Sequence, residues 1–320
     1  MRTPAFLSTF RGAMVALVLG ISIFSIQDPI IKSFSGTYPL TEAIAFRGVF
    51  ALPIFTALVL STGPLRNLWR RRPLALMGRG CLMIASYTTY YLSLADLSLA
   101  TTVSLWFTGP LFMVALSPVI VGERQGWRRW AAVLVGLTGV VVIAHPSNAT
   151  SWAVALPVAA AIFYAIGQLT ARRVGIGIPA PVISWHQNFV YIVFALGLAA
   201  ILAPFVQGFS GEGAGAFLIR PWIVPSVEDA LLLGFCGLIA GIGSTLIVFA
   251  YRTAGPGAIG ALEYTAMLWA ILWGWAFFGN LPTAATIAGA ALIVASGLYA
   301  LTRPAPEPRA SADRAQSHLP

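Results

Sequence analysis

The sequence predicts an all-α membrane protein: a bundle of ten transmembrane helices, arranged as two inverted five-helix repeats with both termini in the cytoplasm. Of the 320 residues, 58% are hydrophobic and only 9% are charged, whereas soluble domains carry roughly 25% charged residues. The apolar residues form ten long runs, the basic residues concentrate in alternate loops, and the second half of the chain repeats features of the first. These three observations lead to the fold class.

Each apolar run is close to the roughly 20 residues that an α-helix needs to cross about 30 Å of hydrocarbon. The first run follows Arg2 and Arg11, as the apolar segment of a signal peptide does. It lacks a small-residue cleavage site and further runs follow it, so we expect a retained helix. The runs are residues 12–31, 39–61, 73–94, 98–121, 129–145, 152–171, 181–205, 229–251, 256–279 and 284–301.

The orientation follows from the basic residues, which accumulate in cytoplasmic loops. With the N-terminus inside, 15 of the 19 Lys and Arg residues fall in cytoplasmic segments, and only Lys32 and Arg220 fall in outer loops. Because the number of crossings is even, both termini are predicted to be cytoplasmic. The tail over residues 303–320 is rich in Pro, Ala, Ser and charge, and we expect it to be disordered.

The two halves of the chain correspond to each other. A shift of 157 residues aligns Gly122-Glu123 with Gly279-Asn280, and Trp106-Phe107-Thr108 with Glu263-Tyr264-Thr265. Each half holds five runs, an odd number, so the two halves must lie in the membrane with opposite orientation. Inverted repeats of this kind are typical of secondary transporters, which bind substrate where the repeats meet. The predicted repeats are residues 1–145 and 146–302.

Several function classes fit the sequence poorly. The arginines punctuate apolar runs and do not cluster on one face, so we expect no nucleic-acid partner. The only lysine, Lys32, follows Ile31 and no glycine-rich loop, so there is no Walker A motif for ATP. His145, His186 and His318 lie far apart, without metal-ligand spacing. We therefore expect no enzyme, no metal and no cofactor, which leaves transport by gradient or exchange.

Arg47 lies inside an apolar run, where a charge costs several kcal/mol and usually marks the path of a polar solute. It is about eight residues below the predicted outer surface, or roughly 12 Å. Its guanidinium suits a carboxylate, a phosphate or a carbonyl-rich solute. A structural ion pair with Asp28 or Glu42 is an equal alternative. Lys32 follows Asp28 by four residues, so it could shield that carboxylate as an ordinary helix pair.

Glu263 is the second charge inside a run, about seven residues from its cytoplasmic end, or roughly 10 Å. A carboxylate at that depth suits proton coupling or pairing with a cationic group of the cargo. The alternative is a structural partnership with Arg79, which enters its run from the same side. The sequence leaves both open.

Pro110 interrupts the fourth run near the predicted midplane and frees a backbone carbonyl, although a packing kink is the alternative. Aromatic residues at similar depths favour a planar, ring-bearing cargo, because rings stack on rings. The predicted substrate-binding residues are Arg47, Tyr87, Tyr90, Trp106, Pro110, Asn188, Glu263 and Tyr264, with Asp28 and Glu263 as candidates for ion coupling.

These residues lie within a series of short motifs, in an order and spacing that resemble the drug/metabolite transporter superfamily, specifically its ten-helix EamA type. The resemblance covers roughly residues 10–302. It departs at Met267, the counterpart of Pro110, and at Asn280, where the family usually repeats a glutamate. The motifs are Gln27-Asp28-Pro29, Arg47, Gly109-Pro110, Gly122-Glu123, Val135–Gly139, Glu263-Tyr264-Thr265, Gly289–Ile293 and Gly297.

The resemblance implies a secondary active transporter in a bacterial-type inner membrane, which moves a small polar metabolite by alternating access. Gln27-Asp28-Pro29 and Glu263-Tyr264-Thr265 look like the branch that includes riboflavin and S-adenosylmethionine uptake carriers, so we expect a cargo of that kind. Export of amino acids, drugs or other metabolites is the alternative within the class. A non-transporting membrane scaffold or receptor is the alternative outside it. The expected partners are the substrate and the bilayer, and a homodimer is left open.

Overall fold

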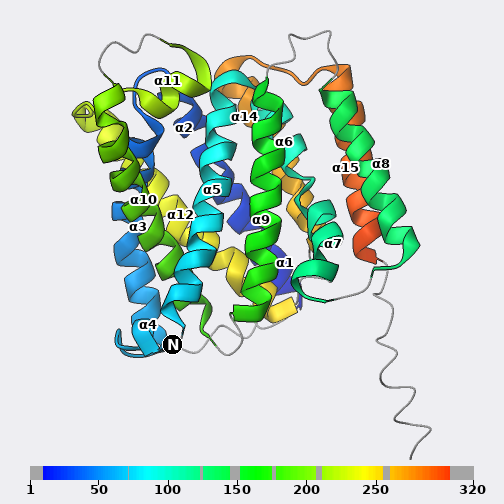
Figure 1. Cartoon of the computed structure of the whole chain (residues 1–320), viewed down its shortest axis with the longest axis horizontal. Helices are drawn as coiled ribbons and strands as arrows, with labels where there is room; N and C mark the ends of the chain where they lie inside the picture. The colour runs from blue at the N-terminus through cyan, green and yellow to red at the C-terminus, as the bar shows by residue number, and fades with distance from the viewer. Residues whose placement is uncertain are drawn as a thin grey trace, which may run out of the picture.

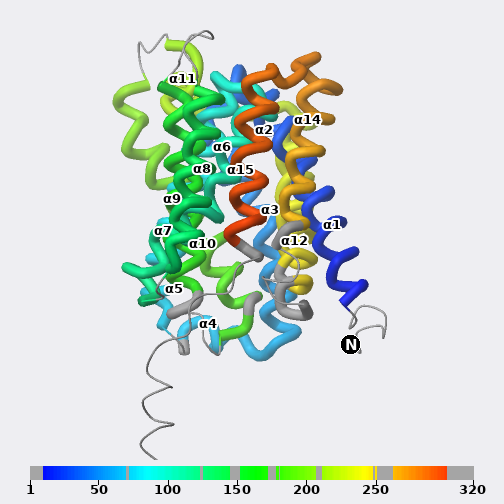
Figure 2. Tube along the Cα trace, turned by 90° about the vertical axis from the view of Figure 1, so that its right-hand side faces the viewer, coloured from blue at the N-terminus to red at the C-terminus, as the bar shows by residue number. Residues whose placement is uncertain are grey.

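The computed structural model describes residues 10–70, 72–122, 125–144, 152–174, 178–206, 211–254 and 260–302. Within these ranges every regular element is a helix, which confirms the predicted all-α class. The long helices lie side by side, and the short helices α4 and α11 lie at opposite ends of the bundle (Figures 1 and 2). The helix α15 runs from the α11 end toward the α4 end, and α1 begins on the α4 side (Figure 1).

Each of the ten predicted runs falls on one or two helices, with further short elements between them. The elements are α1 (Phe10–Ser25), α2 (Gln27–Phe34), α3 (Leu40–Thr62), α4 (Asn67–Arg70), α5 (Pro73–Asp96), α6 (Leu99–Trp106), α7 (Gly109–Ile120), α8 (Trp127–Ile143), η1 (Trp152–Val154), α9 (Ala155–Val174), α10 (Ala180–Leu202), η2 (Ala203–Phe205), α11 (Gly213–Ile219), α12 (Val227–Ala254), η3 (Gly260–Tyr264), α14 (Thr265–Phe278) and α15 (Ala284–Thr302).

The bundle is apolar on its outside as well as inside. Among the described residues, six helical stretches are long and apolar enough to cross a membrane by length and composition, and only 22–44% of each apolar window is buried within the protein. Apolar side chains such as Leu74, Val119 and Val141 are 70% or more exposed. A bundle with such an outer surface fits hydrocarbon as its surroundings. The structure thus supports a membrane-spanning helical bundle, while the count of ten crossings stays a prediction.

The two halves of the chain interleave. The helix α1 packs against α12, α3 against α10 and α12, and α5 against α9 and α10. The helices α6 and α8 pack against α14 and α15. Most long helices of the first half therefore have their main partner in the second half, so the interior of the bundle is formed by both.

Glycine pairs allow two of these contacts to be close. A Cβ on Gly139 of α8 would lie 2.6 Å from the Gly289 carbonyl oxygen of α15, and the reverse distance is 2.5 Å. Gly20 of α1 and Gly243 of α12 form a similar pair at 3.0 and 3.1 Å. Small residues let helix backbones approach closely in a membrane, where dispersion replaces the hydrophobic effect as the attraction. A larger side chain at these positions would separate the helices.

Two of the predicted continuous runs contain a helix break, and the ninth contains a change of helix type beside candidate site residues. The first run breaks at Ile26, the fourth at Phe107 and Thr108, and the ninth changes from η3 to α14 after Tyr264. In the fourth run the break precedes Pro110, because a proline there has no N–H for the carbonyl four residues earlier. These positions matter because the candidate site residues lie beside them.

Candidate functional site

Arg47 of α3 is held inside the bundle by an amide. The side chain is 6% exposed, and its Nε donates a hydrogen bond of 2.9 Å to Oε1 of Gln27, the first residue of α2. The guanidinium carbon lies 4.6 Å from the Tyr87 ring centroid and 6.0 Å from that of Phe24. Gln27 is fully buried, and its Nε2 has no hydrogen-bond partner among the described residues. Arg47 therefore forms its hydrogen bond with the Gln27 amide, whereas the sequence offered the carboxylates of Asp28 and Glu42 as candidate partners.

Asp28, the next residue of α2, accepts two hydrogen bonds from α5. The Tyr91 hydroxyl donates to Oδ1 at 2.6 Å and the Tyr90 hydroxyl to Oδ2 at 3.0 Å. The Arg47 charge also acts on this carboxylate, without a direct hydrogen bond. Burial among apolar side chains favours the neutral carboxyl group, and the two hydroxyl donors and the nearby cation oppose this by stabilising the ionised carboxylate.

Lys32 and Glu42 form hydrogen bonds with backbone groups, whereas the sequence paired Lys32 with Asp28 and Glu42 with Arg47. Lys32 Nζ donates to the backbone oxygens of Leu94 and Leu97, the latter at 2.8 Å, where the end of α5 leaves carbonyls without helical partners. Glu42 accepts a hydrogen bond of 3.3 Å from the backbone N–H of Ile223. Lys32 therefore satisfies carbonyls at the end of α5, and Glu42 bonds a distant segment of the chain.

A continuous row of aromatic rings leads away from Arg47. Tyr87 contacts Tyr91 at 4.3 Å between ring centroids, Tyr91 contacts Tyr90 at 5.1 Å, and Tyr90 contacts Trp106 at 6.3 Å. Trp106 in turn lies 5.0 Å from Tyr164 of α9. The predicted residues Tyr87, Tyr90 and Trp106 are therefore joined. The site prediction omitted Tyr91, although it lies four residues after Tyr87 and hence on the same helix face.

Glu263 and Tyr264 lie in η3, at the change of helix type in the ninth run. The Tyr264 ring lies 4.9 Å from that of Phe107, which follows Trp106 at the break of the fourth run. A side chain on Gly297 would clash with the Tyr264 hydroxyl, so this motif glycine makes room for the ring. Glu263 is half-buried and acts electrostatically on the hydroxyls of Tyr264 and Tyr164. Tyr164 thus joins Glu263 to the aromatic row, and nothing in its apolar helix marked it in advance.

The remaining residues of the predicted site lie nearby in different roles. Asn188 of α10 donates a hydrogen bond of 2.9 Å to the Gly48 carbonyl, which fixes α10 against α3 directly beside Arg47. Pro110 is the second residue of α7, where a missing N–H breaks no bond within the new helix. Arg79, the alternative partner of Glu263, donates a hydrogen bond of 2.8 Å to Gln187.

One connected cluster therefore contains Asp28, Arg47, Tyr87, Tyr90 and Trp106, which we call the central cluster. It offers a guanidinium to acceptor groups, a carboxylate to donor groups, and ring faces to a planar molecule. Within the described residues, no group of three or more His, Cys, Asp and Glu side chains gathers as a metal site would require. Together these groups suit a molecule that has both polar groups and a ring system.

Comparison with known proteins bears on what such a cluster does. The model of the EamA-like transporter family matches residues 11–145. The riboflavin transporter of Rhizobium johnstonii is 26% identical over 296 residues, which cover 90% of each chain. The pseudopaline exporter of Pseudomonas aeruginosa is 25% identical over 297 residues, covering 90% of this chain and 95% of the exporter. The S-adenosylmethionine uptake transporter of Rickettsia prowazekii is 23% identical over 298 residues, covering 92% and 93%.

A solved crystal structure shares the fold. It superposes with a TM-score of 0.60 at 18% sequence identity and covers 91% of this chain and 96% of its own. Relatives named as transporters thus align with nine tenths of the chain, and its apolar helices are those of a membrane transport protein. The family model that matches residues 11–145 and the relatives named as transporters together confirm the resemblance that the motifs indicated.

Proposed function

We propose that this protein is a secondary active transporter, which moves a small polar metabolite with a ring system across the cell inner membrane by alternating access. The observation that carries the proposal is the central cluster, where Arg47 and Asp28 are held among aromatic rings that contact one another inside an apolar bundle. A polar group within a membrane protein is costly and usually serves the passage of a solute. The relatives named as transporters support the same class.

The proposed architecture is ten transmembrane helices in two inverted repeats, with both termini cytoplasmic. Exchanging the halves maps α1 onto α9, α3 onto α10, α5 onto α12, α6 and α7 onto η3 and α14, and α8 onto α15. Under this exchange the α1–α12 contact becomes α9–α5, α3–α12 becomes α10–α5, and α7–α9 becomes α14–α1, and all of these contacts occur. The contact α6–α9 becomes η3–α1, which also occurs, and the contacts α3–α10 and α8–α15 map onto themselves. A contact pattern that survives the exchange supports a two-fold repeat.

The helix irregularities support the same repeat. The shift of 157 residues maps the break at Phe107 and Thr108 onto Tyr264 and Thr265, where η3 gives way to α14. The change of helix type in the second half forms without a proline, since Met267 stands where the first half has Pro110. The geometry of the repeat, more than the proline alone, therefore accounts for the irregularity at both positions. Discontinuous helices at the repeat interface are where transporters of this kind bind their substrate.

Each residue of the cluster has a role in this proposal. Arg47 and the unpartnered Gln27 amide bind acceptor groups of the cargo, while Tyr87, Tyr90, Trp106 and Tyr264 stack on its rings. Asp28 and Glu263 are the candidates for ion coupling, since both carboxylates lie within the apolar part of the bundle. Asn188 and Pro110 set the positions of the helices that carry these side chains.

Riboflavin and S-adenosylmethionine are the proposed cargo types, because each carries a planar ring system and relatives named for each align with 90% and 92% of this chain. Export of a metabolite is the second candidate, which the relative named as a pseudopaline exporter favours. A homodimer is compatible with either direction.

The deciding experiment is uptake of labelled riboflavin and labelled S-adenosylmethionine by cells that lack their own carriers and express this chain. We expect uptake of one of them to saturate and to fall at least tenfold in Arg47→Gln, while Arg66→Gln, at an exposed position just before α4, transports normally. Inside-out vesicles test export with the same compounds. A well-expressed protein that moves neither compound in either direction, nor any from an amino-acid panel, would favour the scaffold or receptor.

A further inference from the structure

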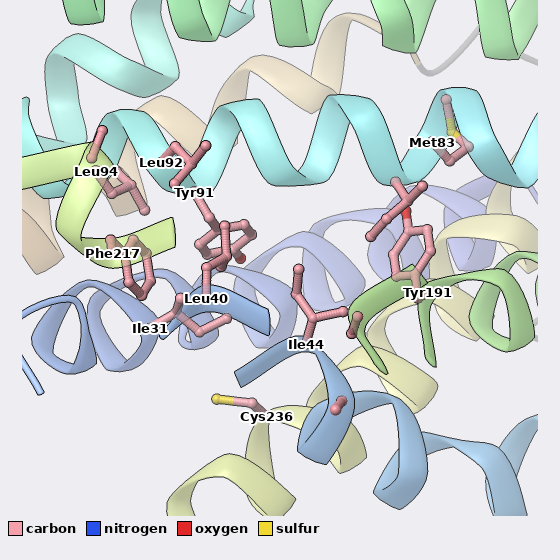
Figure 3. Close-up of a cluster of buried hydrophobic side chains, with 14 of the residues drawn as sticks. Ile31, Leu40, Ile44, Met83, Tyr91, Leu92, Leu94, Tyr191, Phe217 and Cys236 are labelled. Atoms are coloured by element: carbon pink, nitrogen blue, oxygen red, sulfur yellow. The ribbon is translucent and has the colours of Figure 1, made fainter. Parts of the chain in front are cut away.

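Residues 213–226, which precede α12, lie across one end of the bundle (Figure 1). The helix α11 in this segment packs against α5 and α3 at that end (Figure 1). Phe217 of α11 is fully buried and belongs to the same core cluster as Ile31, Leu40 and Leu94, which surround it in Figure 3. The helix is therefore seated in the bundle as part of its core, although it is only seven residues long.

This seat lies about one helical turn beyond the central cluster. Ile31 is three residues after Asp28 on α2, and Leu94 is three residues after Tyr91 on α5, and three residues of helix advance roughly 4.5 Å. Phe217 contacts the cluster that contains both Ile31 and Leu94. The α11 helix thus covers the α11-side approach to Asp28.

Polar contacts orient α11 on this seat. The backbone N–H of Ala214 donates a hydrogen bond of 3.2 Å to Asp96 at the end of α5. The preceding residue, Gly213, has φ +67°, and a side chain there would also clash with Asp96. Glycine is therefore required at 213, both for its backbone conformation and for the approach of the carboxylate.

The residues after α11, from Arg220 to Asp229, form a strap that is bonded to the turn between α2 and α3. The strap has no regular structure before α12 begins, and Val224 within it is 95% exposed. Four hydrogen bonds join the strap to residues 35–42. Arg220 Nη1 donates to the Ser35 carbonyl at 2.7 Å, and Trp222 Nε1 donates to Thr41 Oγ1 at 2.8 Å. The Ile223 N–H donates to Glu42 Oε2 at 3.3 Å, and the Tyr38 hydroxyl donates to Asp229 Oδ2 at 2.6 Å.

We propose that α11 and the strap form a lid, and that its four hydrogen bonds to the α2–α3 turn hold this end of the carrier closed. The proposal rests on the proposed transport function and names the element that gates one side of the same site. Each of these bonds involves at least one side chain, so they can break without unwinding any helix. The helices beneath keep their backbone ladders, which makes the strap the part that opens at least cost. Passage through this end then requires release of the strap.

Cys236 is a native reporter for this movement. It is fully buried in α12 and belongs to the same core cluster as Phe217 and Leu40, beneath the lid. In a Cys81→Ala background it is the remaining cysteine of the chain. A charged, membrane-impermeant methanethiosulfonate can modify it only when the structure opens, so the modification rate follows the open population.

The experiment measures the rate of Cys236 modification in detergent and in vesicles that present the α11 end to the reagent. Tyr38→Phe and Glu42→Gln each weaken one strap bond while keeping the shape of the side chain. Loss of one hydrogen bond changes an equilibrium roughly twofold to tenfold, so we expect each variant to accelerate modification by about that factor. The double variant should accelerate it more than either single variant, and a departure from the product of the two factors measures the coupling between these neighbouring residues.

The matched control is Trp185→Phe, which removes a hydrogen bond of 3.1 Å to Thr56 on the α4 side of the bundle. Trp185 adjoins His186, whose ring contacts Trp69 of α4, so this bond is remote from the lid. We expect the control to leave the rate unchanged. The lid is overturned if Tyr38→Phe and Glu42→Gln remain monodisperse and are modified at the parental rate. It is also overturned if Trp185→Phe accelerates modification equally, because general loosening would then explain the result.

The labelling needs no substrate, so it separates the lid from the proposed function. Failure of every uptake assay with the parental protein would contradict the transporter and leave the labelling result valid. Active transport with no effect of the strap variants on modification would contradict the lid alone.

Discussion

Replacing Tyr91 by Phe should destabilise the protein, whereas the same change at Tyr87 should not. Both residues lie on one face of α5, and both changes delete a single hydroxyl from a ring that packs against its neighbours. The Tyr91 hydroxyl donates a 2.6 Å hydrogen bond to the Asp28 carboxylate, while the buried Tyr87 hydroxyl interacts only weakly with the neutral Tyr91 hydroxyl and bonds no charged group among the described residues. The pair therefore isolates the value of one hydrogen bond to a charged group.

The magnitude follows from the kind of bond. A hydrogen bond to a charged group contributes about 1.5–3 kcal/mol, and removing a buried hydroxyl that is only weakly bonded is close to neutral or stabilising. At about 2 °C of melting temperature per kcal/mol for a chain of this size, Tyr91→Phe lowers the melting temperature by roughly 3–6 °C. Tyr87→Phe leaves it unchanged or raises it, because the Phe ring still packs beneath Arg47.

The assay is thermal unfolding of the purified protein in detergent, followed by tryptophan fluorescence, in two backgrounds. In the parental background we expect the difference just described. In an Asp28→Asn background the acceptor is no longer charged, so the penalty for Tyr91→Phe should shrink by more than half. Equal effects of Tyr91→Phe and Tyr87→Phe, or an undiminished penalty in Asp28→Asn, would refute the assignment of Asp28 as an ionised acceptor.

Three further predictions follow. Glu263→Gln should abolish uptake or remove the dependence of uptake on an ion gradient, while the protein still inserts and folds. The amide keeps the shape of the side chain but cannot exchange a proton, so normal, gradient-dependent uptake would exclude Glu263 from coupling. Gly297→Ala should displace the Tyr264 ring and lower the melting temperature by several degrees, whereas Gly197→Ala, with nothing within 4 Å of the new methyl, should be neutral or stabilising. A reporter fused after Leu301 should report the cytoplasm, and an external signal would overturn the proposed topology.

The fold class was predictable because apolar runs of helical length have few solutions in a membrane. The break at Ile26 was missed, although Pro29 removes the N–H that the Ser25 carbonyl would have accepted. The sequence did not predict the helix α11, because seven residues cannot form a stable helix alone. Phe217 is recognisable as a core residue only from its packing against residues that are distant in the sequence.

The candidate site was predictable for its charges and less so for its contacts. Arg47 and Asp28 stand out because charge is rare in this chain, and they do lie in one cluster. Gln27 was missed as the partner of Arg47, because an amide within an apolar run has little charge signal to mark it. Tyr164 was missed for a similar reason: its place beside Trp106 depends on how α9 packs against α6, which periodicity along one helix cannot show.

The proposed repeat is regular in its backbone and irregular in its chemistry. Under the shift of 157 residues Trp106 corresponds to Glu263, and a shift near 140 brings Arg47 close to Asn188. Equivalent backbone in the two halves is what alternating access needs, since each half must adopt the conformation of the other. Unlike side chains at equivalent positions are what recognition needs, since a cargo with different groups at its two ends cannot be bound by a symmetric site. Arg47 and Asp28 both come from the first half, so the polar end of the cargo should remain with that half while Glu263 and Tyr264 of the second half move past it.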